Sequence, residues 1–251
     1  MSKAYRSMLL PGTWSAEVMA NRVKGHSVDA RTACHRVQPR LPLGLNRGQA
    51  ECVVVPPQLI AAAPTGVDPV HTATIPLNGL TAAQSVELLG IQAGQSVLIT
   101  GAEGAVGGYA VQLAKRRGAV VIASDLSPDG EFATKAAGGD VYVSASQPLV
   151  EAVRRVRPEG GDAFLDTARL GQALVGAVVD GGRFVATRID ALPQAERGIQ
   201  VLLTQVGPDA AMLTTLSDLA ATGDLAGPRV GSRGASSSPS GRGGRGRSRQ
   251  R

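Results

Sequence analysis

Residues 96–125 decide the fold of this 251-residue chain: Ser-Val-Leu-Ile-Thr-Gly-Ala-Glu-Gly-Ala-Val-Gly-Gly-Tyr-Ala-Val-Gln-Leu-Ala-Lys-Arg-Arg-Gly-Ala-Val-Val-Ile-Ala-Ser-Asp. The apolar run 97–99 predicts a strand buried on both faces, because strands of parallel sheets read as continuous apolar stretches. A glycine-rich turn follows, and then apolar residues recur at helical spacing up to Gly118. A second apolar run, 120–123, ends at Asp125. This order predicts a strand–turn–helix–strand unit.

The three glycines of the turn are spaced three residues apart, and each suits the approach of a phosphate group. Gly101 allows the chain to leave the strand in a tight turn, and Gly104 allows backbone to approach the phosphate. Gly107 allows the new helix to pack closely on the strand. The N–H groups at the start of that helix then face the anion. We interpret the stretch as a dinucleotide-binding unit; the alternative is an α/β unit that binds no nucleotide.

Strand and helix patterns alternate beyond this unit as far as residue 222. Such alternation requires right-handed crossovers and predicts an α/β fold, a doubly wound six-stranded parallel sheet of the Rossmann type. The predicted strands are 97–100, 120–123, 141–143, 162–166, 183–187 and 199–206, and the predicted helices are 70–75, 78–89, 106–117, 130–137, 149–156, 170–179 and 209–222.

The pattern divides the chain into four parts. Residues 1–48 lack a sustained period and are expected to form a poorly structured segment, while 49–92 read as a short strand and connecting helices. Residues 93–224 form the predicted dinucleotide-binding domain. Residues 225–251 contain Arg, Gly and Ser with too few apolar residues to bury, which predicts a disordered tail.

Charge is distributed unevenly along the chain. Its net charge of +6 combines basic ends with an acidic middle, since residues 51–224 hold eleven Lys and Arg against eighteen acids. No apolar run approaches the roughly 20 residues that span a bilayer, and the N-terminus lacks a signal-peptide pattern, so a cytoplasmic protein without membrane contact is expected. Cys34, Cys52, His26, His35 and His71 lack metal-ligand spacing, so no metal site is expected.

The chain from about residue 47 to residue 223 resembles the medium-chain dehydrogenase/reductase superfamily, and within it the zinc-free quinone oxidoreductase-like branch. The motifs that carry the resemblance are Val-Val-Val-Pro-Pro-Gln (53–58), Pro-Leu-Asn-Gly-Leu-Thr-Ala-Ala (76–83), Val-Leu-Ile-Thr-Gly-Ala-Glu-Gly-Ala-Val-Gly (97–107), Val-Gln-Leu-Ala-Lys (111–115), Phe-Leu-Asp-Thr (164–167) and Gly-Gly-Arg-Phe-Val (181–185).

The resemblance implies a nicotinamide dinucleotide, NADP(H) in most of this branch, that reduces a quinone or an enone by hydride transfer. It also implies a set of residues around the cofactor. Pyrophosphate would contact Gly101, Ala102, Gly104, Ala105, Val106 and Gly107; the adenosine ribose would contact Ser124 and Asp125; the nicotinamide would lie beside Thr81; and Thr167 and Ala168 would line the cleft.

The choice between the two nicotinamide cofactors stays open at this point. A carboxylate at Asp125 can accept hydrogen bonds from a ribose 2′-hydroxyl and would repel a 2′-phosphate, which favours NAD(H) over the NADP(H) that the resemblance implies. The nearest downstream cation is Lys135. The alternative is that Asp125 only stabilises the turn at residues 127–128.

Both ends of the chain depart from the resembling family, whose members carry a complete catalytic domain before and after these motifs. The resemblance implies that residues 49–92 are a remnant of that domain with its connecting helices. We therefore expect a cofactor-binding domain with impaired or no catalysis, and no catalytic residue is assigned. Residues 199–206 are expected to form an edge strand that pairs in a homodimer, as in that family.

The alternative function is a nucleic-acid-binding protein that acts through the arginine-rich tail. Glycine and serine separate seven arginines there, as in segments that bind phosphate backbones. The tail lacks an aromatic residue that would stack on a base, which favours a solvated tail without a nucleic-acid partner.

Overall fold

The computed structural model describes residues 14–17, 33–36, 60–127 and 129–228. The larger part is a doubly wound sheet of six parallel strands: β4 (Ser96–Thr100), β5 (Val120–Asp125), β6 (Val141–Ser144), β7 (Gly161–Asp166), β8 (Val178–Ala186) and β9 (Gln200–Leu203). Their spatial order is β6-β5-β4-β7-β8-β9. The chain order reverses between β4 and β7, and the crevice at the carboxyl ends there is where such sheets bind ligands.

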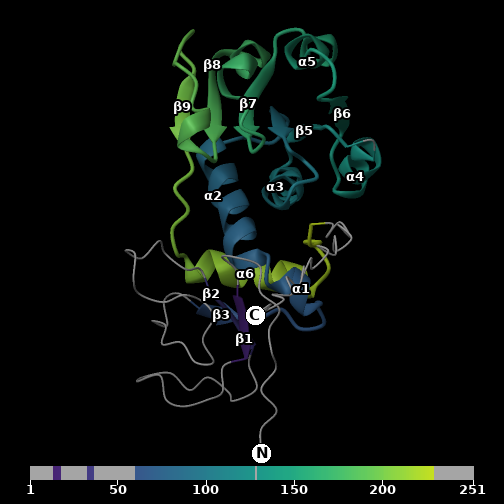
Figure 1. The fold of residues 1–251 in the computed structure, drawn as a ribbon, viewed down its shortest axis with the longest axis vertical. Coiled ribbons are helices and arrows are strands. Elements are labelled where there is room, and N and C mark those ends of the chain that lie inside the picture. Colours follow the sequence, from purple (N-terminus) through teal and green to yellow (C-terminus); the bar gives the residue numbers. More distant parts are fainter. Residues whose placement is uncertain (1–13, 18–32, 37–59, 128, 229–251) are drawn as a thin grey trace, which may run out of the picture.

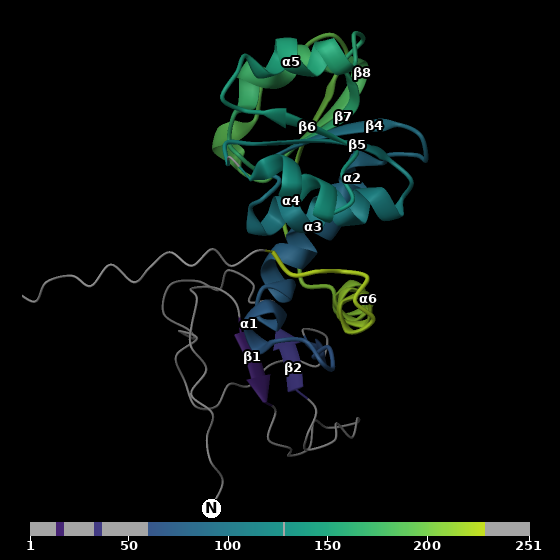
Figure 2. The same ribbon diagram turned by 90° about the vertical axis from the view of Figure 1, so that its right-hand side faces the viewer.

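Helices cover both faces of this sheet (Figures 1 and 2). One face carries α2 (Leu80–Leu89), α3 (Ala105–Arg116) and α4 (Gly130–Ala136), and the other carries α5 (Leu149–Val156) and the 3-10 helix η3 (Gly171–Ala177). Alternate residues of one strand serve the two cores: Val97 and Ile99 of β4 join one buried cluster, and Leu98 joins the other. The prediction of a parallel sheet with two buried faces is confirmed.

A second, smaller part lies beyond the lower end of α2 in Figure 1. It contains the antiparallel strands β1 (Trp14–Glu17), β2 (Ala33–Arg36) and β3 (Ile60–Ala62), the short helix α1 (Pro69–Thr72), the π-helix η2 (Ile75–Gly79) and the helix α6 (Ala210–Ala221). Asp68 caps α1 by accepting a hydrogen bond from the Val70 N–H (2.8 Å). The strands β1 and β2 occur within the N-terminal segment whose sequence shows no period.

Two local predictions need correction. The predicted helix at 170–179 is a 3-10 helix that ends at Ala177, because Val178 already pairs with Gly161 in the sheet. The predicted helix at 78–89 begins at Leu80 as an α-helix and is preceded by η2. The β-like run 52–55, the cysteine Cys52 and the tail beyond residue 228 lie outside the described residues.

Asp162 joins the first residues of β4 and β7. Its carboxylate accepts hydrogen bonds from the backbone N–H (2.8 Å) and the hydroxyl (2.6 Å) of Ser96. Partial burial opposes ionisation, but these hydrogen bonds outweigh it and hold the pKa of Asp162 below its ordinary value of 3.8. A carboxylate with a lowered pKa stabilises the fold above its unfolded pKa, and this stabilisation is lost as the pH falls through the folded value.

We therefore expect the free energy of unfolding of the natural chain to fall as the pH is lowered from about 5 to about 2, as measured by urea denaturation. The substitution Asp162→Asn, which keeps a hydrogen-bond acceptor and removes the titration, should make this pH dependence shallower. Identical pH profiles for the two proteins would contradict the assignment.

Candidate functional site

The glycine-rich turn connects the carboxyl end of β4 to the start of α3. Gly101 adopts a left-handed conformation (φ +63°), which glycine accepts without a steric cost. A Cβ atom on Gly107 would lie 2.0 Å from the carbonyl oxygen of Gly101, so only glycine lets the first turn of α3 pack against the end of the strand. The structure therefore supports the packing roles that the sequence assigns to these two glycines.

The start of α3 faces this edge of the sheet with unfilled backbone donors. The first N–H groups of an α-helix have no partner within the helix. Gly104 is the N-cap residue, and no side chain of the described residues caps the helix there. The N–H groups of Ala105, Val106 and Gly107 belong to this first turn, where the helix dipole favours an anion.

Asp125 fastens the turn to the neighbouring strand. One carboxylate oxygen accepts the backbone N–H of Glu103 (3.0 Å), and the other accepts the N–H groups of Leu126 (2.7 Å) and Ser127 (3.2 Å). Next to it, the Ala102 N–H donates to the backbone oxygen of Ser124 (3.1 Å). Asp125 is half-buried at the carboxyl end of β5, so it both holds the turn and borders the edge where a ribose is expected.

Ser124 lies in a different environment from the one its expected role requires. Its side chain is fully buried, and its hydroxyl has no hydrogen-bond partner in the part of the chain that the structure describes. A side chain without exposed surface cannot contact an adenosine ribose in this conformation. Of the two residues expected at the ribose, only Asp125 is therefore accessible to it.

Thr167 and Ala168 lie beside the turn from the β7 side. The Thr167 hydroxyl donates to the backbone oxygen of Thr100 at 2.6 Å. A Cβ atom on Gly101 would be 2.6 Å from the Thr167 hydroxyl oxygen and 3.7 Å from the Ala168 Cβ. The structure thus brings both residues next to the glycine turn.

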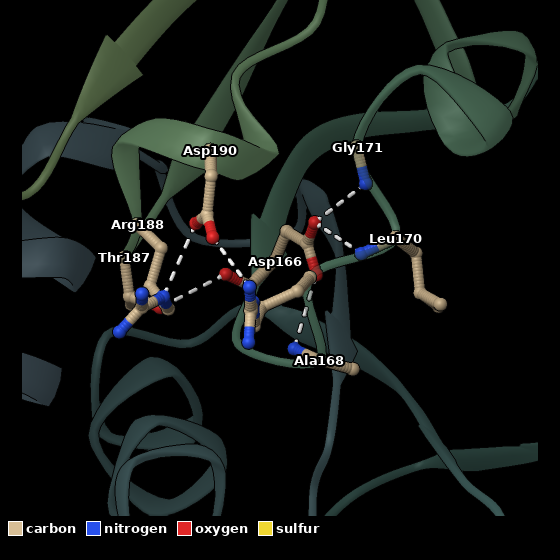
Figure 3. Close-up of polar contacts among 8 residues, drawn as sticks. Asp166, Ala168, Leu170, Gly171, Thr187, Arg188 and Asp190 are labelled. Carbon is tan, nitrogen blue, oxygen red and sulfur yellow. Dashed lines mark hydrogen bonds and ion pairs between the residues drawn. The ribbon is translucent and has the colours of Figure 1, made fainter.

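Asp166 organises this side of the edge, a role that was not predicted from the sequence (Figure 3). Its buried carboxylate accepts hydrogen bonds from the Thr100 hydroxyl (3.0 Å) and from three backbone N–H groups within the following loop. Those donors are Ala168 (3.0 Å), Leu170 (2.8 Å) and Gly171 (2.8 Å). Its backbone oxygen also accepts from Thr187 after β8. The signal available in the sequence was an acidic residue at the end of an apolar strand.

Thr81 lies in the first turn of α2, and its hydroxyl donates to the Leu77 backbone oxygen (2.7 Å). One helical turn later, the Ser85 hydroxyl lies 2.8 Å from that of Thr204, which follows β9. Gln84 exchanges two hydrogen bonds of 2.9 Å with the backbone of Gly207. These contacts hold this part of α2 against the carboxyl end of β9, so Thr81 lies near the carboxyl edge of the sheet.

The β5 side of the edge is negatively charged. Partial burial raises the pKa of the Tyr142 phenol, and the charges of Asp125, Glu103 and Glu131 raise it further. The phenol donates to the backbone oxygens of Asp125 (3.0 Å) and Ser127 (3.2 Å). Lys135 forms an ion pair with Glu131 (2.7 Å). The 2′-phosphate of an NADP(H) molecule would be repelled by these carboxylates if it lay near Asp125.

The described residues contain no group of three His, Cys, Asp or Glu side chains placed to hold a metal ion. Cys34 and His35 lie in β2, and Cys52 and His26 lie outside the described residues. None of the helices in the described ranges has the length and apolar character that crossing a membrane requires.

Several known oxidoreductases resemble this chain in sequence or in fold. No protein-family model matches the chain. A curated NAD-dependent alcohol dehydrogenase from Saccharolobus solfataricus is 33% identical over 129 residues, which cover 49% of this chain and 37% of that protein. The NADP-dependent oxidoreductase RED1 from Cochliobolus heterostrophus is 41% identical over 103 residues, 40% of this chain and 29% of the relative.

A crystal structure of an NAD-dependent alcohol dehydrogenase superposes with a TM-score of 0.71 at 27% identity and covers 86% of this chain and 72% of that one. The chain is similar to medium-chain alcohol dehydrogenase- and enoyl reductase-like oxidoreductases. It has the nicotinamide-dinucleotide-binding fold of these oxidoreductases. The chain spans about a third of the length of the two curated relatives named above (37% and 29%).

The contact between Gly107 and Gly101 yields a mutational test. Gly107→Ala should lower the free energy of unfolding by about 1–3 kcal/mol, because the added methyl forces the turn and the helix apart. Gly108→Ala is the matched control, since its Cβ would lie 3.4 Å from the nearest neighbouring atom, the Ala102 oxygen, within a helix. That control should stabilise the fold by about 0.5–1 kcal/mol. Equal effects in chemical denaturation would contradict the packing role of Gly107.

Proposed function

We propose that this chain binds NAD(H) across the carboxyl edge of its parallel sheet, with the pyrophosphate at the start of α3. The observation that carries the proposal is the turn at 101–107: its glycines leave space for close backbone approach, and the uncapped first turn of α3 presents N–H donors. The relatives are described as NAD- or NADP-dependent oxidoreductases, which supports a dinucleotide as the ligand.

The remaining assignments of the proposal follow the edge of the sheet. Asp125 would accept a hydrogen bond from the adenosine ribose, since its carboxylate oxygens can accept more bonds than the three they have. Thr167 and Ala168 would line the cleft beside the turn, and Thr81 would lie beside the nicotinamide. When bound, the reduced cofactor would supply the hydride, and these residues would hold and orient the cofactor.

Preference for NAD(H) over NADP(H) rests on charge. The charges of Asp125, Glu103 and Glu131 all act on the neighbouring Tyr142 phenol, and Lys135 is paired with Glu131. Bringing a phosphate near these carboxylates costs Coulomb energy, whereas a 2′-hydroxyl can donate a hydrogen bond to Asp125.

The substitution Asp125→Ala tests both the site and the preference. We expect it to weaken NADH binding about tenfold, the effect of losing one charge-assisted hydrogen bond, and to weaken NADPH binding less. Asp129→Ala is the control, because Asp129 is exposed and its side chain does not cap α4. Titration calorimetry gives both affinities; equal losses of NADH and NADPH binding would contradict the role of Asp125.

Binding itself is tested with the natural chain. NADH at a hundredfold excess over its dissociation constant should add about 2.7 kcal/mol to the free energy of unfolding. If both NADH and NADPH leave the free energy of unfolding unchanged, the proposed function is refuted. We further propose that the chain reduces a quinone or an enone by hydride transfer. The rate of NADH- or NADPH-dependent quinone reduction, measured in the same preparation, tests the expectation of impaired catalysis separately from binding.

A homodimer formed through β9 is a second part of the proposal. β9 ends the sheet order, so one of its edges has no partner strand among the described residues. An open edge offers unpaired N–H and C=O groups to a second copy. Light scattering should then give twice the chain mass of 25.6 kDa; a single chain mass at all concentrations would reject this dimer.

Residues 229–251 of the arginine-rich tail lie outside the described residues, and nucleic-acid binding through the tail remains the alternative function. RNA binding that is equal with and without residues 229–251 would eliminate that alternative.

A further inference from the structure

The loops after β7 and β8 carry a charged cluster that the proposed function leaves unused: Arg169, Arg188 and Asp190, of which Figure 3 labels the last two. Asp190 accepts a hydrogen bond from the Arg188 Nε (3.1 Å) and another from an Nη of Arg169. The hydrogen bond from Arg188, followed by that from Arg169, lowers the pKa of Asp190, which is therefore ionised at neutral pH. Two guanidinium groups share one carboxylate, so the cluster carries a net charge of +1.

The backbone at Arg169 is strained. Its φ is +65°, a left-handed value that among the described residues other than glycine only Arg169 and Arg197 adopt. Such a conformation is uncommon for a residue with a side chain and is often kept at functional sites. The Asp166 carboxylate imposes it by binding the N–H of Ala168 on one side and those of Leu170 and Gly171 on the other.

Both cations remain accessible to a ligand. Their side chains are 56% (Arg169) and 54% (Arg188) exposed. Each guanidinium has five N–H donors, and within the described part of the chain each donates to Asp190 only. Asp190 thus fixes the two groups while most of their donors stay available. Guanidinium donors of this kind bind carboxylate and phosphate oxygens in pairs.

The sheet order places the cluster relative to the cofactor. Asp125 is the last residue of β5 on one side of β4, whereas Arg169 and Arg188 follow β7 and β8 on the other side. Arg169 directly follows Ala168 in the chain. The Cβ of Ala168 lies 3.7 Å from the position that a Cβ atom on Gly101 would take. The cluster therefore lies beyond the pyrophosphate turn, on the side away from the adenosine ribose.

We propose that Arg169 and Arg188 form an anion-binding site that holds a carboxylate or phosphate group on the side of the cleft away from the adenosine. Two sources supply such a group there: the pyrophosphate of the cofactor itself, or an acidic group on the molecule that exchanges hydride with it. The position of the site relative to the cofactor rests on the proposed function, whereas binding of a free anion does not require it.

The test uses the full chain and inorganic pyrophosphate, titrated by calorimetry at low salt with and without saturating NADH. Arg169→Gly removes one cation and suits the left-handed backbone, so the fold should persist. Arg188→Gln removes the other cation. Arg155→Gln is the matched control, because Arg155 is an exposed arginine at the end of α5 that bonds Gln147. Urea denaturation checks that all variants are folded.

Each of the first two variants should raise the dissociation constant for pyrophosphate about tenfold relative to Arg155→Gln. If the effect persists in the NADH-saturated protein, the anion belongs to the substrate. If NADH displaces pyrophosphate and the same variants weaken NADH binding, the anion belongs to the cofactor. Pyrophosphate and NADH binding that match the control in both variants, or no pyrophosphate binding by the natural chain, would overturn the proposal. A natural chain that binds pyrophosphate but not NADH would refute only the proposed function.

Discussion

The close approach of Gly107 to the carbonyl of Gly101 is the constraint on which the site depends. It allows α3 to start directly on the end of β4, so that the first N–H groups of the helix point to the carboxyl edge of the sheet. A side chain at Gly107 would separate strand and helix and remove the space that a phosphate needs. Because β4 is central in the sheet, its position also governs the loops after β5 and β7.

Two carboxylates stabilise the loops on either side of this turn. Asp125 binds the N–H of Glu103 from the β5 side, and Asp166 binds the Thr100 hydroxyl and three N–H groups from the β7 side. Both supply acceptors that irregular backbone cannot provide for itself, since buried N–H groups need hydrogen-bond partners. The edge is therefore held in shape before a ligand arrives, which reduces the ordering cost of binding.

Much of the fold was predictable because its signals are local. The strand β4, the glycine turn and α3 follow one another in sequence. The glycines just after the ends of α2 and α3, Gly90 and Gly118, have positive φ in the structure. The predicted helix at 170–179 failed because pairing of Val178 with the distant Gly161 outweighed local helical spacing. β1 and β2 were likewise hidden, since their partners lie 16 or more residues away along the chain.

The site was predictable in part for the same reason. The glycines of the turn and the Thr167–Ala168 pair directly follow predicted strands, and ligands of parallel sheets bind at the carboxyl ends of the strands. The burial of Ser124 and the Arg169–Asp190 contact depend on elements brought together only by folding, and the latter joins residues 21 positions apart. Hydrogen bonds between a side chain and backbone N–H groups, such as those of Asp166, produce no periodic pattern in the sequence.

The central claim, that a nicotinamide dinucleotide binds where β4 meets α3, is tested most directly by amide chemical shifts during an NADH titration of the ¹⁵N-labelled chain. Binding at this place predicts saturable shifts that are largest at Gly104 to Gly107, with smaller ones at Thr167 and Ala168. Saturable NADH binding whose largest shifts lie elsewhere, for example at the amino ends of the strands, would contradict it.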